Sequence, residues 1–221
     1  MRTPRDSQET DKTKEQLLKA ANRVFLREGY GKVSMKMLAE EAGCTTGKFY
    51  CNNLGKPELL RLLGVRYREL IRDSAKELLK KYKLRNLSEE ENLQVSFLIE
   101  MLIFLELARL SETAAELFGV ALSLPETRTD ISGYIKERLK PTPVEQQSVA
   151  YIPFVLSGAL FSMEQAPGKA YRELAEPFLR NLLVNLKLTP ELNKELSAEL
   201  PEKEAAIHEQ AYRGLVRMLK L

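Results

Sequence analysis

The sequence has few of the residues on which enzyme sites are most often built. It contains one histidine, His208, and two cysteines, Cys44 and Cys51, among 221 residues, and no tryptophan. A single histidine excludes a metal site with several imidazole ligands, and the spacing of the two cysteines is not that of zinc ligands. The glycine-rich, P-loop, HExxH and GxSxG motifs are absent as well. We therefore expect no catalytic residues, no metal and no cofactor, and thus a protein that is not an enzyme.

Long apolar runs are also missing. No stretch approaches the roughly 18 apolar residues that a membrane-spanning helix needs. The N-terminal segment MRTPRDSQETDKTKEQ is polar and lacks the apolar centre of a signal peptide. Two cysteines without such a signal fit a reducing compartment. With 44% apolar residues, the chain can still bury a substantial core. We expect a soluble cytoplasmic protein with no membrane partner.

Positive charge is concentrated at one end of the chain. Residues 1–68 hold 14 Lys and Arg against 8 Asp and Glu, a net charge of +6, whereas residues 69–221 hold 20 against 23, a net charge of −3. A basic N-terminal unit suits a partner rich in phosphate. An uneven distribution by chance is the alternative, so the charge supports a nucleic-acid partner without establishing one.

The stretch from Ser34 to Lys56 has the pattern of two short helices joined by a tight turn. Ser34 can cap the first helix with its hydroxyl, and Val33 and Leu38 have the spacing of a hydrophobic staple. Gly43 ends this helix, because glycine adopts positive φ at the lowest cost. Thr45 is placed to cap a second helix that follows at once. A capped helix, a glycine turn and a short second helix predict a helix-turn-helix, whose second helix enters the DNA major groove.

A set of spaced residues runs through this stretch and beyond it on both sides: Ala20, Ala21, Phe25, Gly29, Tyr30, Ser34, Ala39, Ala42, Gly43, Gly47, Tyr50, Lys56 and Leu59. In these residues and their spacing, about the first 65 residues resemble the N-terminal domain of TetR-family transcriptional regulators. The resemblance departs from the family pattern at Lys48, where a small hydroxyl residue is usual, and at Asn52-Asn53, where the family has His-Phe. The missing Phe predicts that an apolar contact beneath the second helix is lost.

The resemblance implies how the helix-turn-helix meets DNA. Tyr50 and Lys56 would contact phosphates, which position the protein without choosing a sequence. Thr46 and Lys48 lie where base edges are read, and a lysine can donate to guanine O6 and N7. The alternative for Lys48 is a solvated surface residue. The residues that we expect at DNA are Ser34, Lys36, Thr45, Thr46, Gly47, Lys48, Tyr50 and Lys56.

The helices that flank the motif can be placed by their apolar periodicity. We expect a loose arm over residues 1–10, a first helix from Thr13 to Glu28, and a long helix over residues 57–83 that links head to body. Ser88 and Glu91 predict a capping box at the start of the next helix. A shorter helix follows from Ser111 to Leu122, and Pro125 and residues 130–133 are expected to interrupt the pattern.

Two late apolar helices are expected, over residues 142–163 and 171–186, and an extra amphipathic segment over residues 190–221. The resemblance implies that the pair forms a homodimer interface; the alternative is that both helices pack into the monomer core. The extra segment extends that interface or covers the core. His208, within it, has no partner pattern and reads as a surface residue.

The resemblance also implies a pocket for a small-molecule effector in the body. Aromatic and sulfur side chains are the candidates, with a plain core role as the alternative. The apolar lining favours a hydrophobic or aromatic ligand. The candidate ligand-binding residues are Phe97, Met101, Phe104, Phe118, Tyr151 and Phe154.

Taken together, these patterns predict an all-α protein. Residues 1–56 would form a three-helix DNA-binding domain, and residues 84–221 a helical regulatory and dimerisation bundle. The predicted function is a sequence-specific transcriptional regulator, a repressor that binds a pseudo-palindromic operator in double-stranded DNA and is released by a small hydrophobic ligand. The alternative is a helical dimeric binding module whose head is degenerate and which acts through protein partners.

Overall fold

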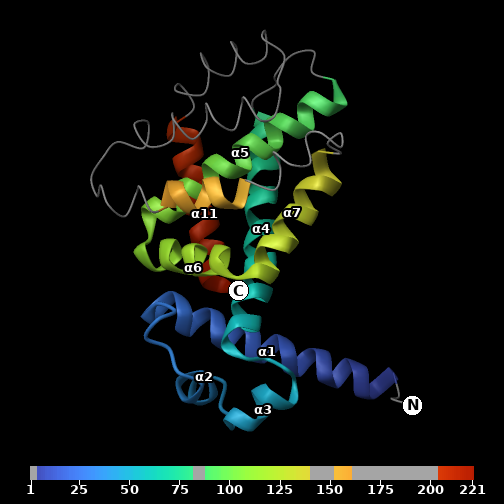
Figure 1. The fold of residues 1–221 in the computed structure, drawn as a ribbon, viewed down its shortest axis with the longest axis vertical. Coiled ribbons are helices and arrows are strands. Elements are labelled where there is room, and N and C mark those ends of the chain that lie inside the picture. Colours follow the sequence, from blue (N-terminus) through green and yellow to red (C-terminus); the bar gives the residue numbers. More distant parts are fainter. Residues whose placement is uncertain (1–3, 82–87, 140–151, 161–203) are drawn as a thin grey trace.

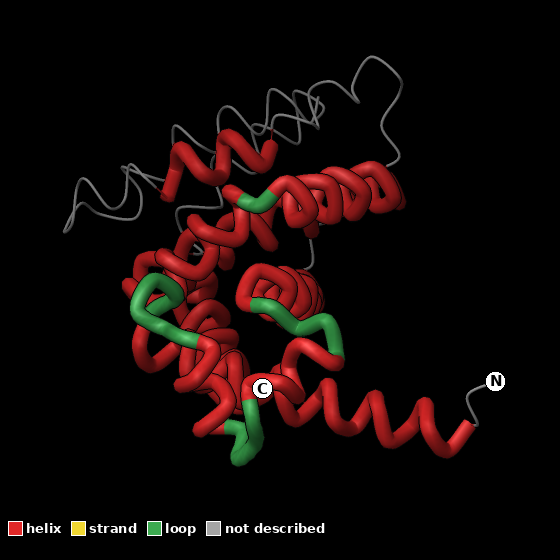
Figure 2. Tube along the Cα trace, turned by 60° about the horizontal axis from the view of Figure 1, so that its bottom comes forward, coloured by secondary structure: helices red, strands yellow, loops and turns green. Residues whose placement is uncertain are grey.

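The structure is a computed structural model that describes residues 4–81, 88–139, 152–160 and 204–221. Within these ranges the chain forms helices joined by loops, without strands (Figure 2). The all-α fold class is therefore confirmed. The helices α1–α3 lie at one end of the molecule, and the long helix α4 rises from them into the remaining helices, which form the body (Figure 1).

Helix α1 runs from Pro4 to Glu28 and anchors the head. Its predicted apolar stripe is buried, with Phe25 and Val24 fully inaccessible to solvent. The expected loose arm and the start at Thr13 were wrong, because the helix begins at Pro4. Proline suits the first turn of a helix, where its missing N–H costs nothing, and no further proline or glycine occurs before Gly29.

Helix α4 spans Lys56–Lys81 and is about 40 Å long at 1.5 Å per residue. It belongs to the head at its first turn and to the body over most of its length (Figure 1). Leu59, Leu63, Tyr67, Ala75 and Leu78 form its buried face, and Leu70 is half-buried beside them. A single continuous helix therefore connects the two ends of the molecule.

Helices α5 (Glu89–Leu110), α6 (Glu112–Ser123) and α7 (Pro125–Leu139) build the body. The predicted capping box is present, because Glu91 N donates to Ser88 Oγ and Ser88 N donates to Glu91 Oε2. The expected interruption at residues 130–133 was wrong: α7 is continuous. Pro125 begins α7 rather than breaking a helix, again because a first-turn proline loses no hydrogen bond.

Helix α11 (Glu204–Lys220) packs lengthwise against α4 and α5. The inner face of α11 is buried, at Ile207, Ala211 and Met218. This part of the C-terminal segment therefore covers the monomer core. His208 is exposed, as predicted, but the expectation that it has no partner was wrong. Its Nδ1 lies 2.6 Å from Oε1 of the buried Glu106, a pairing between α11 and α5 that sequence spacing could not reveal.

Residues 152–160 are helical, and within them Ile152, Leu156 and Leu160 are buried while Phe154 is 58% exposed. The rest of the two helices predicted for residues 142–163 and 171–186 lies outside the described residues. So do the first part of the 190–221 segment and the predicted pocket residue Tyr151.

Candidate nucleic-acid interface

Helix α2 (Met35–Glu41) begins and ends as its sequence requires. Ser34 adopts an extended backbone, and its Oγ accepts a hydrogen bond from Met37 N at 3.3 Å, which satisfies one free amide of the first turn. Val33 and Leu38, the predicted staple, are both buried. Gly43 follows the helix with φ +63°, the left-handed conformation that glycine adopts without strain. The turn that aims the next helix is thus fixed by residues within the motif.

Helix α3 (Thr46–Cys51) is the recognition helix of the motif. Thr45 has the extended backbone of a capping residue, but its side chain makes no capping hydrogen bond. Phe49 is completely buried beneath α3, and Leu54 is 2% exposed beside it. Leu54 N also donates to Phe49 O at 2.9 Å, which closes the end of the helix.

The predicted loss of the apolar contact beneath α3 was therefore wrong. Asn53 has φ +57°, a conformation that asparagine tolerates and a bulky aromatic residue does not. The chain passes through this residue and delivers the next one, Leu54, to the core. Asn52 contributes a second fixing contact, because its Nδ2 donates to Lys48 O at 2.8 Å. Reading one residue further along the sequence would have found the substitute.

Most of the residues expected at DNA are exposed to solvent. Lys48 and Tyr50 project from α3, and Tyr50 is 59% exposed, which is unusual for an aromatic residue in a well-packed domain. Lys36, on α2, lies 3.9 Å from Glu40 and is otherwise exposed. No carboxylate in the described part of the chain pairs with Lys48. The exposed members are Ser34, Lys36, Thr45, Gly47, Lys48 and Tyr50, whereas Thr46 and Lys56 are half-buried.

Lys56 has a structural role that the sequence did not indicate. Its Nζ donates to Tyr30 O and Val33 O, each at 2.7 Å, and lies 4.1 Å from the centre of the Tyr30 ring. Partial burial lowers the pKa of Lys56. Two of the three ammonium protons thus hold the loop before α2, which leaves one for a phosphate. Its phosphate contact remains a prediction.

Two arginines of α1 hold α2 in place. Arg23 Nε lies 2.7 Å from Glu41 Oε1, and Arg27 Nη1 lies 3.2 Å from Glu41 Oε2. These hydrogen bonds, from Arg23 first and Arg27 second, lower the pKa of Glu41. Because these arginines are engaged within the head and Lys36 lies near Glu40, Lys48 of α3 is the lysine of the two motif helices that carries unpaired positive charge.

The head is also tied to the body. Gly31 N, in the loop between α1 and α2, donates to Glu116 Oε1 of α6 at 2.7 Å. Gly29 in the same loop has φ +80°, and a Cβ there would lie 2.3 Å from Glu116 Oε2. Gly29 therefore serves both a backbone conformation and a close approach, neither of which the residues of the motif alone could show.

A second connection between head and body runs through Tyr67, near the middle of α4. The Tyr67 hydroxyl donates to Asn22 Oδ1 of α1, and Asn22 Nδ2 donates to Met218 O of α11 at 2.7 Å. Tyr67 and Asn22 are both almost inaccessible to solvent. Burial raises the pKa of the Tyr67 hydroxyl, which stays protonated as a donor. This chain of polar contacts joins α1, α4 and α11.

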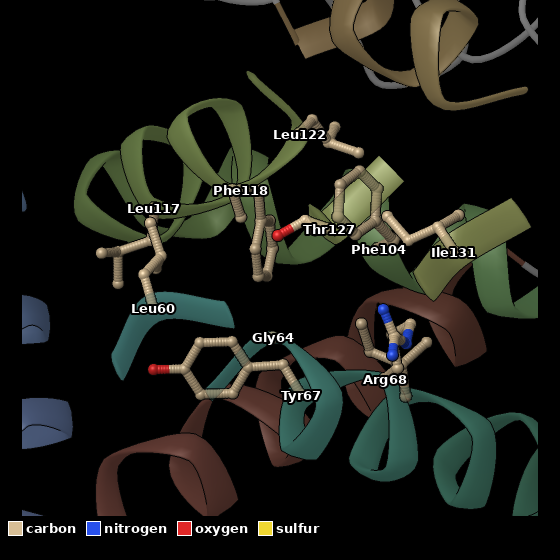
Figure 3. Close-up of a pocket in the computed structure, with 12 residues that line it drawn as sticks. Leu60, Gly64, Tyr67, Arg68, Phe104, Leu117, Phe118, Leu122, Thr127 and Ile131 are labelled. Carbon is tan, nitrogen blue, oxygen red and sulfur yellow. The ribbon is translucent and has the colours of Figure 1, made fainter. Parts of the chain in front are cut away.

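The body contains a small cavity of about 50 Å³ between α4, α5, α6 and α7 (Figure 3). Phe104 and Phe118, two of the predicted ligand-binding residues, lie on its wall with their rings stacked at 4.6 Å. The other predicted residues that the structure describes are elsewhere. Phe97 is fully buried in the core, Met101 is half-buried against it, and Phe154 is exposed.

Residues of α4 that were not predicted to bind a ligand complete this cavity. Leu60, Gly64, Tyr67, Arg68 and Ile71 form one side of it. These positions belong to the helix whose apolar stripe reads simply as core. Only the packing of α4 against α6 and α7 shows that part of its surface is left uncovered.

A seated recognition helix, a basic exposed face and one long helix leading to a helical body define a DNA-binding regulator. Residues 17–61 match the family model described as bacterial regulatory proteins, tetR family, a match that covers the second half of α1, the helix-turn-helix and the first residues of α4. This N-terminal domain of the tetR type supports a DNA-binding transcriptional regulator. No curated protein matches it.

Two other kinds of site are absent from the described ranges. No helix there is long and apolar enough to cross a membrane. No group of three or more histidine, cysteine, aspartate or glutamate side chains in the described residues is placed to hold a metal ion.

Proposed function

We propose that this protein is a transcriptional repressor that binds a pseudo-palindromic operator as a homodimer and is released by a small hydrophobic ligand. The observation that carries the proposal is the contrast between the two sides of α3. Phe49 and Leu54 fix the helix from beneath, while Lys48 and Tyr50 remain exposed. A helix that is rigidly held and presents unpaired donors is suited to reading base edges and phosphates.

Homodimer formation follows from the size of the head. A single α3 of six residues reaches only a few base pairs, so a two-fold pair of heads is needed for a specific site. The exposed ring of Phe154, within residues 152–160, is an apolar surface available to a partner chain. This exposed ring supports a dimer in which residues 152–160 of one chain contact the same residues of the second chain.

Release by a ligand requires that the ligand favours one arrangement of the head over another. Two hydrogen bonds connect residues at or next to the cavity wall with the head. Tyr67 forms part of the cavity wall and donates to Asn22 of α1, and Glu116 lies next to the wall residue Leu117 and binds Gly31. A ligand that displaces α6 or α4 would therefore move residues to which the recognition motif is attached.

The test is selection of binding sites from random duplex DNA by the full-length protein at two salt concentrations. We expect enrichment of a palindrome and a steep fall in affinity with salt, because phosphate contacts release counterions. The Lys48→Ala variant should lose affinity, whereas Lys80→Ala, at the far exposed end of α4, should behave as the wild type.

Two results would contradict the proposal. Absence of any enriched sequence at either salt concentration would remove sequence-specific binding and favour action through protein partners. An enriched sequence without two-fold symmetry, bound by a monomer, would remove the homodimer.

A further inference from the structure

Asn22 is a polar residue within the buried apolar face of α1. Its side chain is completely inaccessible to solvent, as are those of Ala21 and Phe25 on the same helix. A buried amide of this kind is stable only when its oxygen and its nitrogen both have partners. The Tyr67 hydroxyl donates to Asn22 Oδ1, and Asn22 Nδ2 donates to Met218 O at 2.7 Å. The second of these hydrogen bonds joins the head to a helix 196 residues further along the chain.

The carbonyl that Asn22 binds belongs to the last turn of α11. Carbonyls in the last turn of a helix have no intrahelical amide to bind, so they can accept a hydrogen bond from another element. Met218 O accepts from Leu221 N at 3.3 Å and, at the shorter distance, from Asn22. The Met218 side chain is also fully buried. The end of α11 therefore holds α1 both by apolar packing and by a directed hydrogen bond.

Helix α11 is itself attached to the body. Arg217 Nη2 lies 3.0 Å from Glu77 Oε1 of α4, and His208 Nδ1 lies 2.6 Å from Glu106 Oε1 of α5. Helix α11 runs beside α4 and α5 and ends next to α1 (Figure 1). Any movement of α1 relative to the end of α11 is therefore a movement of the head relative to the body.

The bond from Asn22 acts together with the bond from Glu116 to Gly31. The two bonds come from different helices of the body, α11 and α6, and they hold different parts of the head. Asn22 lies six residues before the end of α1 at Glu28, a distance of about 9 Å along the helix. A head held at one point could turn about that point. Two separate points, together with the continuous helix α4, oppose such a turn.

We infer that Asn22 is a positioning residue for DNA binding, whose hydrogen bond to α11 fixes the angle between head and body. In a dimer, that angle sets the spacing of the two half-sites that the α3 helices reach, and this part of the inference rests on the proposed function. Each base pair inserted between half-sites moves the second one by about 3.4 Å and turns it by roughly 35°. A head that follows this displacement must break the Asn22 bond and leave buried polar groups without partners.

The experiment measures binding of the full-length protein to its selected operator and to versions with one base pair inserted or removed between the half-sites. The wild type should prefer its own spacing. Asn22→Leu has a similar volume and lacks the amide, so its head has no such bond to break. We expect the ratio of affinities for the preferred and altered spacings to fall roughly 5- to 100-fold in this variant, the range for a buried hydrogen bond.

Tyr67→Phe is the matched control. It removes the other hydrogen bond of the same amide and leaves the bond from Asn22 to Met218 in place. This variant should be less stable than the wild type and should keep the wild-type ratio between spacings. A residue that only stabilises the fold would change the affinity for all spacings alike. Asn22→Ala replaces Asn22→Leu if circular dichroism shows that the latter does not fold.

A second measurement needs no DNA. Pulsed electron paramagnetic resonance gives the distance between a spin label on Cys51 of α3 and one introduced at the exposed position of Lys136→Cys on α7. Cys44→Ala removes the other thiol, and excess unlabelled protein ensures that only distances within one chain are recorded. We expect one narrow distance distribution in the otherwise wild-type protein and in Tyr67→Phe, and a broader or shifted distribution in Asn22→Leu.

The inference would be overturned by an unchanged ratio between spacings in Asn22→Leu, or by an equal fall of that ratio in Tyr67→Phe. The same distance distribution in all three proteins would also overturn it. If the wild type selects no paired half-sites, the proposed dimeric operator fails. The distance measurement then decides by itself whether Asn22 fixes the head, so the two failures are distinguishable.

Discussion

Leu54 is the residue on which the position of the recognition helix most directly depends. Its side chain is 2% exposed and lies beside the fully buried Phe49, and its amide closes the end of α3. Leu54→Ala would remove buried carbons and leave a cavity, which costs about 2–5 kcal/mol in comparable cores. Helix α3 has only six residues and is not stable alone, so most of this loss would fall on the seating of α3.

The consequence for DNA binding follows from population. A loss of about 2–5 kcal/mol lowers the ratio of seated to displaced α3 by roughly 30- to several-thousand-fold, because each 1.4 kcal/mol is tenfold. Apparent affinity falls in proportion to the fraction of binding-competent protein. We therefore expect α3 amides to lose hydrogen-exchange protection and operator affinity to fall, while the body retains its protection.

Exchange measured by mass spectrometry on the full chain reports both regions at once. Leu219→Ala is the matched control, because Leu219 is 57% exposed on α11 and its truncation should change the free energy of unfolding by less than about 0.5 kcal/mol. Unchanged protection of α3 in Leu54→Ala, or equal loss in the two variants, would refute the argument that Leu54 seats the recognition helix.

Other predictions address the DNA face, the buried polar link and pH. If Lys48 reads a base, Lys48→Ala should relax the sequence preference at one operator position. If Lys48 contacts a phosphate instead, the slope of log affinity against log salt concentration should fall by about 0.9 per phosphate. Binding titrations at several salt concentrations distinguish the two outcomes. Tyr67→Phe should lower the free energy of unfolding by about 1–3 kcal/mol in urea titrations, since it leaves Asn22 Oδ1 buried without its donor; an unchanged midpoint would contradict this. The hydrogen bond from Arg61 lowers the pKa of Glu58 in the folded protein. At pH values between the folded and the unfolded pKa, the unfolded chain therefore binds more protons than the folded chain. The ion pair's contribution to the free energy of unfolding is present above the unfolded pKa and is lost as pH falls through the folded pKa. Glu58→Gln should therefore reduce the acid sensitivity of unfolding, by about 0–1 kcal/mol because the pair is partly exposed; an unaltered acid limb of the stability curve would argue against the pair.

The helix-turn-helix could be predicted from the sequence because its signals are local. The Ser34 cap, the staple of Val33 and Leu38, and the glycine after the first helix act within a few residues of the chain. The capping box at Ser88 and the buried stripe of α1 were found for the same reason. Such features depend on backbone hydrogen bonds and helical spacing, which the order of residues specifies directly.

Prediction failed where proline and asparagine permit more than one local structure. Pro4 and Pro125 begin helices rather than mark loops, and residues 130–133 continue α7. At Asn53, the left-handed backbone shifted the apolar contact to Leu54. At Asn53 the local preference was weak, and burial of Leu54 in the folded chain decided between the alternatives.

By itself, the sequence determined that the protein is helical and that it has a basic head with a helix-turn-helix. The tertiary structure alone decided which distant groups meet. It placed Glu116 against Gly31, Lys56 on the carbonyls before α2, and Asn22 on the carbonyl of Met218. These pairings depend on how helices far apart in the chain pack against one another, and no periodicity within a single helix encodes that arrangement.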